Sequence, residues 1–75
     1  MVAATHMNWN RIEANWGQFK GNVKKEWDAL TDQQIDMIAG KRDQLAGTLQ
    51  ETYGLSKAVA EEEIAVWQEN QSERQ

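Results

Sequence analysis

Five cationic side chains are the residues of this sequence whose type and spacing best suit binding chemistry. Lys20, Lys24 and Lys25 lie close together, and Lys41 with Arg42 follows further along the chain. Ammonium and guanidinium groups that gather on one helix face can bind phosphate. Weak nucleic-acid binding is therefore one function that these residues could serve, and we treat it as the alternative to binding another protein. The competing interpretation is a solvated face, on which Lys24 and Lys25 near a helix C-terminus suit the helix dipole.

Four tryptophans offer a second kind of chemistry, because indole rings stack on bases and sugars. Trp9, Trp16 and Trp27 share the spacing of an apolar helix face, and we interpret them as core residues. Trp67 lies near the C-terminus and is the tryptophan that we expect to be partly exposed. The candidate interaction surface therefore comprises Lys20, Lys24, Lys25, Lys41, Arg42 and Trp67.

Catalytic and metal-binding sets are missing from the sequence. There is no cysteine, and the one histidine is His6. The run Glu61–Glu63 carries three carboxylates, but consecutive helix positions diverge by about 100° and do not converge on a cation. We therefore expect no enzymatic activity, no catalytic residue, no cofactor and no metal site.

Hydrophobic spacing predicts four helices, at residues of about 8–28, 32–39, 41–53 and 57–69. In the first, apolar residues recur every three or four positions from Trp9 to Leu30, and Asn8 is a suitable N-cap. Thr31 with Gln34 forms a capping box that predicts the start of the second helix, and Ser56 is a cap candidate for the fourth. One unbroken helix over 32–53 is the alternative, because Gly40 alone need not end a helix.

Length and composition predict one small all-α domain over residues 7–69. The chain has 75 residues, no proline and a net charge of −4, and its charge becomes more negative toward the C-terminus. We expect residues 1–6 to be a disordered cloning remnant and residues 70–75 to be a frayed tail. No stretch approaches the roughly 20 apolar residues of a membrane span.

A weak internal repeat links the two halves of the chain at an offset of 26 residues. Gln18 matches Gln44 and Gly21 matches Gly47, and after a one-residue deletion the pair Leu30-Thr31 matches Leu55-Ser56. Any two amphipathic helices share apolar spacing, so matches between apolar residues say little. The glycine, glutamine and hydroxyl matches are what indicate an internal duplication. Two helical hairpins packed across each other would bury both apolar faces.

Five segments of the sequence are distinctive: residues 7–13, 15–21, 30–32, 38–45 and 49–56, of which Ile38–Leu45 is the most specific. Together they resemble the CsbD-like family of small bacterial general stress-response proteins, over about residues 7–67. It implies a compact array of four helices, arranged as two roughly orthogonal hairpins as in sterile-alpha-motif domains. It also implies a cytoplasmic location, and it brings no catalytic or binding residue with it.

The sequence thus predicts a non-enzymatic stress-response protein that acts through surface interactions. We expect a monomer that binds no membrane, with a protein as the possible partner and nucleic acid as a weaker alternative. The chain carries more glutamine and glutamate than the lysine-rich pattern of the family, which argues against nucleic-acid binding.

Overall fold

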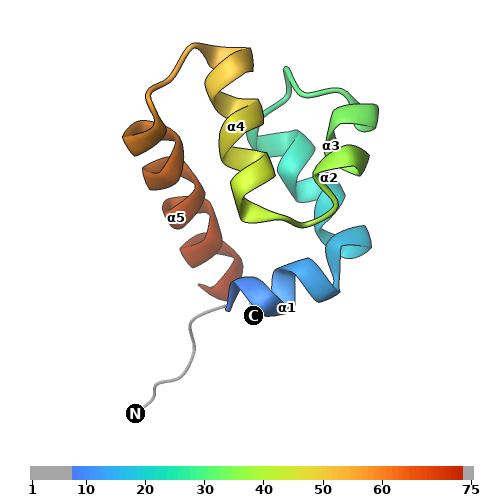
Figure 1. The fold of residues 1–75 in the computed structure, drawn as a ribbon. Helices are drawn as coiled ribbons and strands as arrows, with labels where there is room; N and C mark the ends of the chain where they lie inside the picture. The colour runs from blue at the N-terminus through green and yellow to red at the C-terminus, as the bar shows by residue number, and fades with distance from the viewer. Residues whose placement is uncertain (1–7, 74–75) are drawn as a thin grey trace.

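The computed structural model describes residues 8–73, with side chains described for residues 8–71, and this part of the chain is entirely helical (Figure 1). Its helices are α1 (Trp9–Ala14), α2 (Trp16–Glu26), α3 (Asp32–Ile38), α4 (Arg42–Tyr53) and α5 (Lys57–Glu73). The Cα radius of gyration is 12.1 Å. The predictions for residues 1–6 and for the last two residues lie outside the described range.

The single helix expected over 8–28 is instead two helices that meet at Asn15, so the described chain has five helices rather than four. Asn15 has φ −115° and ψ 31°, outside helical geometry. Its side-chain amide donates to the carbonyl oxygen of Arg11 at 2.9 Å. An asparagine side chain competes in this way for backbone groups, which explains a break in a strongly periodic segment.

The predicted capping box at the start of α3 is confirmed. The hydroxyl of Thr31 accepts from the backbone N–H of Gln34 at 3.0 Å, and the side chain of Gln34 accepts from the N–H of Thr31 at 2.9 Å. The hydroxyl of Ser56 accepts from the N–H of Val59 at 3.2 Å and caps α5 in the same manner. Side-chain oxygens therefore set both helix starts, as the sequence indicated.

The chain turns sharply between α3 and α4, which excludes the unbroken helix over 32–53. Ala39 and Gly40 have φ values of 52° and 81°, in the left-handed region that ends a helix. A Cβ at Gly40 would lie 2.9 Å from the Cα of Glu13, so this turn approaches the backbone of α1. The indole N–H of Trp9 also donates to the carbonyl oxygen of Gly40 at 2.8 Å, which fixes α1 on the turn.

α5 is longer than the predicted 57–69 and continues through Glu73. Its last turns are held by Gln71, whose side-chain oxygen accepts from the amide of Asn22 on α2 at 3.1 Å. The side-chain amide of Gln71 also donates to the carbonyl oxygen of Trp67 at 3.1 Å. These contacts hold a polar segment that composition alone suggests will fray.

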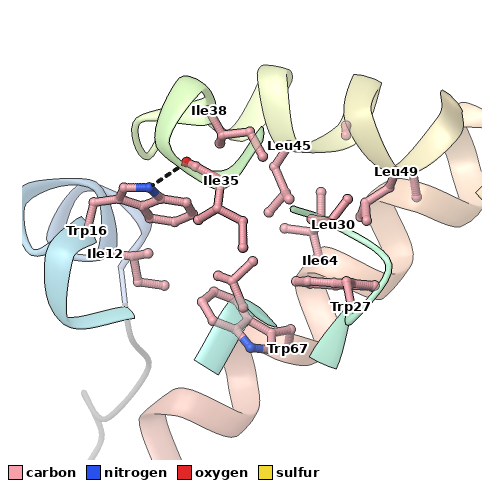
Figure 2. Packing of buried hydrophobic residues seen from close by; sticks show 13 residues of the cluster. Ile12, Trp16, Trp27, Leu30, Ile35, Ile38, Leu45, Leu49, Ile64 and Trp67 are labelled. Carbon is pink, nitrogen blue, oxygen red and sulfur yellow. Dashed lines mark hydrogen bonds between the residues drawn. The ribbon is translucent and has the colours of Figure 1, made fainter. Parts of the chain in front are cut away.

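One hydrophobic core joins all five helices (Figure 2). The side chains of Ile12, Leu45, Leu49 and Ile64 are completely buried. Trp16 packs among them, and its indole N–H donates to the carbonyl oxygen of Ile35 at 3.1 Å. Of the three tryptophans predicted to be core residues, Trp16 and Trp27 are buried, whereas Trp9 is only partly buried and packs against the core. The full buried set is Ile12, Trp16, Val23, Trp27, Leu30, Ile35, Ile38, Leu45, Ala46, Leu49, Ala60, Ile64 and Trp67.

Candidate interaction surface

Trp67 does not belong to the surface, and the expectation that it is partly exposed is wrong. Its side chain is 3% exposed. The centroid of its ring lies 5.8 Å from that of Trp27 and 6.1 Å from those of Trp9 and Phe19. Tilted and edge-on contacts at these separations stabilise aromatic clusters. Trp67 is therefore the central member of a four-ring cluster that fixes α5 against α1 and α2.

Lys20 and Lys24 extend from α2 toward two carboxylates of α3. The ammonium of Lys20 forms a hydrogen-bonded ion pair with Asp36, and that of Lys24 lies 3.7 Å from Asp32. Lys24 also donates to the carbonyl oxygen of Leu30 at 2.9 Å. Half-exposed pairs of this kind contribute about 0–1 kcal/mol each to stability. Their larger effect is on the surface, because each lysine carries a negative neighbour.

A hollow of about 420 Å³ lies between α2 and α3, and these two ion pairs line it. Gly21 and Ile35 complete the lining. Because two ammonium groups and two carboxylates surround the hollow, their charges largely compensate. Such a lining does not favour a phosphate, which needs cations without competing carboxylates.

Lys41, just before α4, pairs with Glu13 of α1 at 2.9 Å between the ammonium nitrogen and the carboxylate oxygen. The hydrogen bond that Lys41 donates to Glu13 and the attraction of the Glu13 charge raise the pKa of Lys41 above the usual 10.5. This pair flanks the close approach of Gly40 to α1. The ion pair of Lys41 therefore connects α1 to the turn that precedes α4.

Arg42 joins three helices. Its guanidinium lies 3.2 Å from the carboxylate of Glu61 and 3.1 Å from the side-chain oxygen of Gln68, both on α5. The guanidinium carbon also lies 5.6 Å from the centroid of the Trp9 ring on α1, within cation–π range. A guanidinium held by a carboxylate, an amide and a ring has little capacity left for an external phosphate.

Lys25 differs from the other four predicted cations. It is exposed on α2 and takes part in no ion pair within residues 8–73. The structure therefore does not bring the five cations together as one positive face. Lys20 and Lys24 lie against α3, whereas Lys41 and Arg42 connect α1, the α3–α4 turn and α5.

α5 also has an exposed face with apolar side chains, which its residue range alone did not predict. Val59 is 41% exposed and Val66 is 56% exposed. Ala60, Ile64 and Trp67 form the buried side, and each valine lies one residue from it, about 100° around the helix. A helical projection would have given this signal. We name this surface the α5 outer face; it comprises Ala58, Val59, Glu62, Ala65 and Val66, all exposed.

Within residues 8–73, no group of three histidine, cysteine, aspartate or glutamate side chains has a geometry that could hold a metal ion. In the same range, no helix is long and apolar enough to cross a bilayer. Four of the ion pairs in this range join different parts of the fold, and the fifth, between Lys57 and Glu61, lies within α5.

Comparison with known proteins gives one consistent result. The family model described as CsbD-like matches residues 10–62 of the chain. The UPF0337 protein YjbJ of Escherichia coli K12 is 50% identical over 62 residues, which span 83% of this chain and 90% of the relative.

Two further relatives come from different bacteria. A UPF0337 protein of Pectobacterium atrosepticum is 47% identical over 64 residues, covering 85% of this chain and 93% of the relative. A UPF0337 protein of Rhodopseudomonas palustris is 54% identical over 61 residues, covering 81% and 92%. No solved structure is significantly similar to the chain.

Proposed function

Because this chain belongs to the CsbD-like family, a family of the general stress response, we propose that it is a non-enzymatic cytoplasmic protein that acts by presenting a folded surface to another protein. Membership of the family supports a role in the stress response. The exposed side chains of the chain itself support action through contact with another protein. The contact surface that we propose is the α5 outer face.

The exposure of the two valines is the observation that carries this proposal. Val59 and Val66 lie two helical turns apart on the same side of α5 and are 41% and 56% exposed. Glu62 lies between them and has no ion pair within residues 8–73. Apolar residues at i and i+7 on an open helix face have the anchor spacing by which amphipathic helices contact partner proteins.

Nucleic-acid binding has weaker support than protein binding. Four of the five predicted cations lie within 4 Å of a carboxylate, and Lys25 alone among them is unpaired in the described chain. One unpaired cation on a chain of net charge −4 gives little attraction for a phosphate backbone. We therefore make no separate proposal for the basic residues.

Photo-crosslinking in stressed cells tests the proposed surface. A photoreactive aromatic amino acid replaces Val66 in the full chain, and a second chain carries it at Met37, which is 74% exposed on α3. We expect covalent protein adducts at position 66 in excess of those at position 37, because position 37 measures chance capture by an exposed apolar side chain. Equal yields from two chains with normal thermal transitions would refute the proposal.

The finer arrangement of the fold is also a proposal. The extensive contact between α4 and α5 supports one helical hairpin of the kind found in sterile-alpha-motif domains, whereas α3 contacts α2 and α4 to the same extent. Figure 1 shows α4 and α5 side by side, with α1 near the C-terminal end of α5. Interhelical distances from nuclear Overhauser contacts would test this arrangement.

A further inference from the structure

We propose that the α5 outer face of one copy packs against the exposed side of α2 in a second copy, which gives a weak head-to-tail self-association. This inference rests on the proposed function, since it assigns a partner to the same α5 outer face. It replaces the monomer expected from the sequence with a chain that associates as its concentration rises.

The exposed side of α2 carries glycines that the fold does not require. Gly17, Gly21 and Lys25 are spaced by four residues and all are exposed; we name them the α2 outer face. A Cβ at Gly17 or Gly21 would meet no atom within 4 Å, and neither glycine has a positive φ. Each glycine costs about 1 kcal/mol relative to alanine in a helix.

These glycines give α2 a surface on which another helix can lie close. The distance between packed helix axes depends on the side chains at the contact, and it shortens where these are small. Gly21 also borders the hollow between α2 and α3, whose lining includes the side chain of Ile35. A small apolar side chain from a neighbouring helix would therefore find an open position over Gly21, at the edge of this hollow.

The α5 outer face carries small and apolar side chains that could lie against such a surface. Ala58 and Ala65 are small and permit close approach, while Val59 and Val66 project at a spacing of seven residues, or about 10.5 Å along the helix. α5 lies at one edge of the array beside α4, so this side of the helix is accessible (Figure 1). Gly17 and Gly21 lie only about 6 Å apart along α2, so one valine at a time can seat at this pair of glycines.

Charge selects this pairing over pairing of α5 with itself. Lys25 on α2 and Glu62 on α5 are both exposed, and both lack an ion pair within residues 8–73. A two-fold contact of α5 with α5 would bring the two copies of Glu62 together, whereas packing α5 on α2 sets Glu62 against Lys25. Because the two faces differ, the contact is heterologous and extends from copy to copy.

Sedimentation equilibrium of the full chain from roughly micromolar to millimolar concentration measures this association. We expect the average mass to rise with concentration for the wild type and the association constant to fall by about tenfold or more in Gly21→Gln. The matched control is Gly47→Gln on α4, where a Cβ also meets nothing within 4 Å. Glutamine favours helix at both positions, and a thermal melt of each variant checks that the longer side chain is accommodated. Only Gly21→Gln should lose association.

A charge exchange tests the contact itself. Lys25→Glu and Glu62→Lys should each abolish association alone, because every contact then sets like charges together. An equimolar mixture of the two variants should associate again, since opposite charges then meet at each contact. A mixture that stays monomeric, or a Gly21→Gln chain that associates like the wild type, overturns the proposal.

The two proposals fail in different ways. A wild-type chain that stays monomeric to millimolar concentration overturns self-association. If position 66 still captures a different protein in stressed cells, the proposed function stands. If position 66 captures nothing above the Met37 background, the proposed function fails whatever the chain does in solution.

Discussion

Substituting alanine at three glycines should give three different stabilities, and the structure fixes their order. Gly40 has φ 81°, and an added Cβ would lie 2.9 Å from both the Cα and the Cγ of Glu13. An L-residue in the left-handed region costs about 1–2 kcal/mol. Forcing α1 away from the turn adds the cost of overpacking, about 1–3 kcal/mol. Gly40→Ala should therefore destabilise the fold by about 2–5 kcal/mol.

Substitutions at Gly54 and Gly21 separate the cost of the left-handed backbone from the cost of overpacking. Gly54 has φ 67°, and a Cβ added there would meet no atom within 4 Å, so Gly54→Ala should cost only the backbone contribution of about 1–2 kcal/mol. Gly21 has neither a positive φ nor a neighbour within 4 Å. Gly21→Ala should therefore stabilise the fold by about 1 kcal/mol, through helix propensity alone.

Urea unfolding followed by tryptophan fluorescence measures all three differences in one assay. The free energies are comparable if the slope of the unfolding free energy against urea is unchanged. A small domain has a total stability of only about 5–15 kcal/mol, so the Gly40→Ala chain should be visibly weakened at room temperature. If Gly40→Ala costs no more than Gly54→Ala, the close approach of the turn to Glu13 is not a real constraint.

The remaining predictions concern a core indole, a helix cap and an ion pair. Trp16→Ala should cost about 3–5 kcal/mol by leaving a cavity, and retention of a native thermal transition would contradict its place in the core. Thr31→Ala should cost about 0.5–2 kcal/mol in urea unfolding, whereas Thr31→Ser keeps the hydroxyl and should cost less. The raised pKa of Lys41 implies that the stability from its pair with Glu13 is complete below pH 10.5 and is lost as pH rises through the folded-state pKa. The stability difference between wild type and Glu13→Gln should therefore shrink in strongly alkaline solution, and a difference independent of pH there would rule out the pair as its source.

Local sequence signals predicted helix starts well and one helix break poorly. Thr31 and Ser56 begin α3 and α5 as their hydroxyls indicated. The break at Asn15 was missed because the apolar spacing runs through it without interruption. The internal repeat contained the missing signal: an offset of 26 residues places Asn15 on Lys41 and α2 on α4, so the break before α4 has a counterpart before α2.

The spacing of apolar residues did not predict which side chains of different helices contact one another. Lys20 and Arg42 looked like surface cations because their partners, Asp36 and Glu61, are 16 and 19 residues away in the chain. The exposure of Trp67 was also predicted wrongly, because position near a chain end says nothing about which rings pack around it. Spacing identifies the faces of a helix, whereas charge neutralisation and ring packing depend on which helices become neighbours.

The most direct test of the proposed contact is a photo-crosslinking scan along the exposed positions of α5 in stressed cells. Adduct yield should depend on the face of α5 on which each position lies. High yields are expected at Ala58, Glu62, Ala65 and Val66. Low yields are expected at Lys57 and Gln68, which lie beside the contact with Arg42. Yields that are uniform along α5, or that peak at Lys57 and Gln68, would contradict the assignment of the α5 outer face as the surface through which the protein acts.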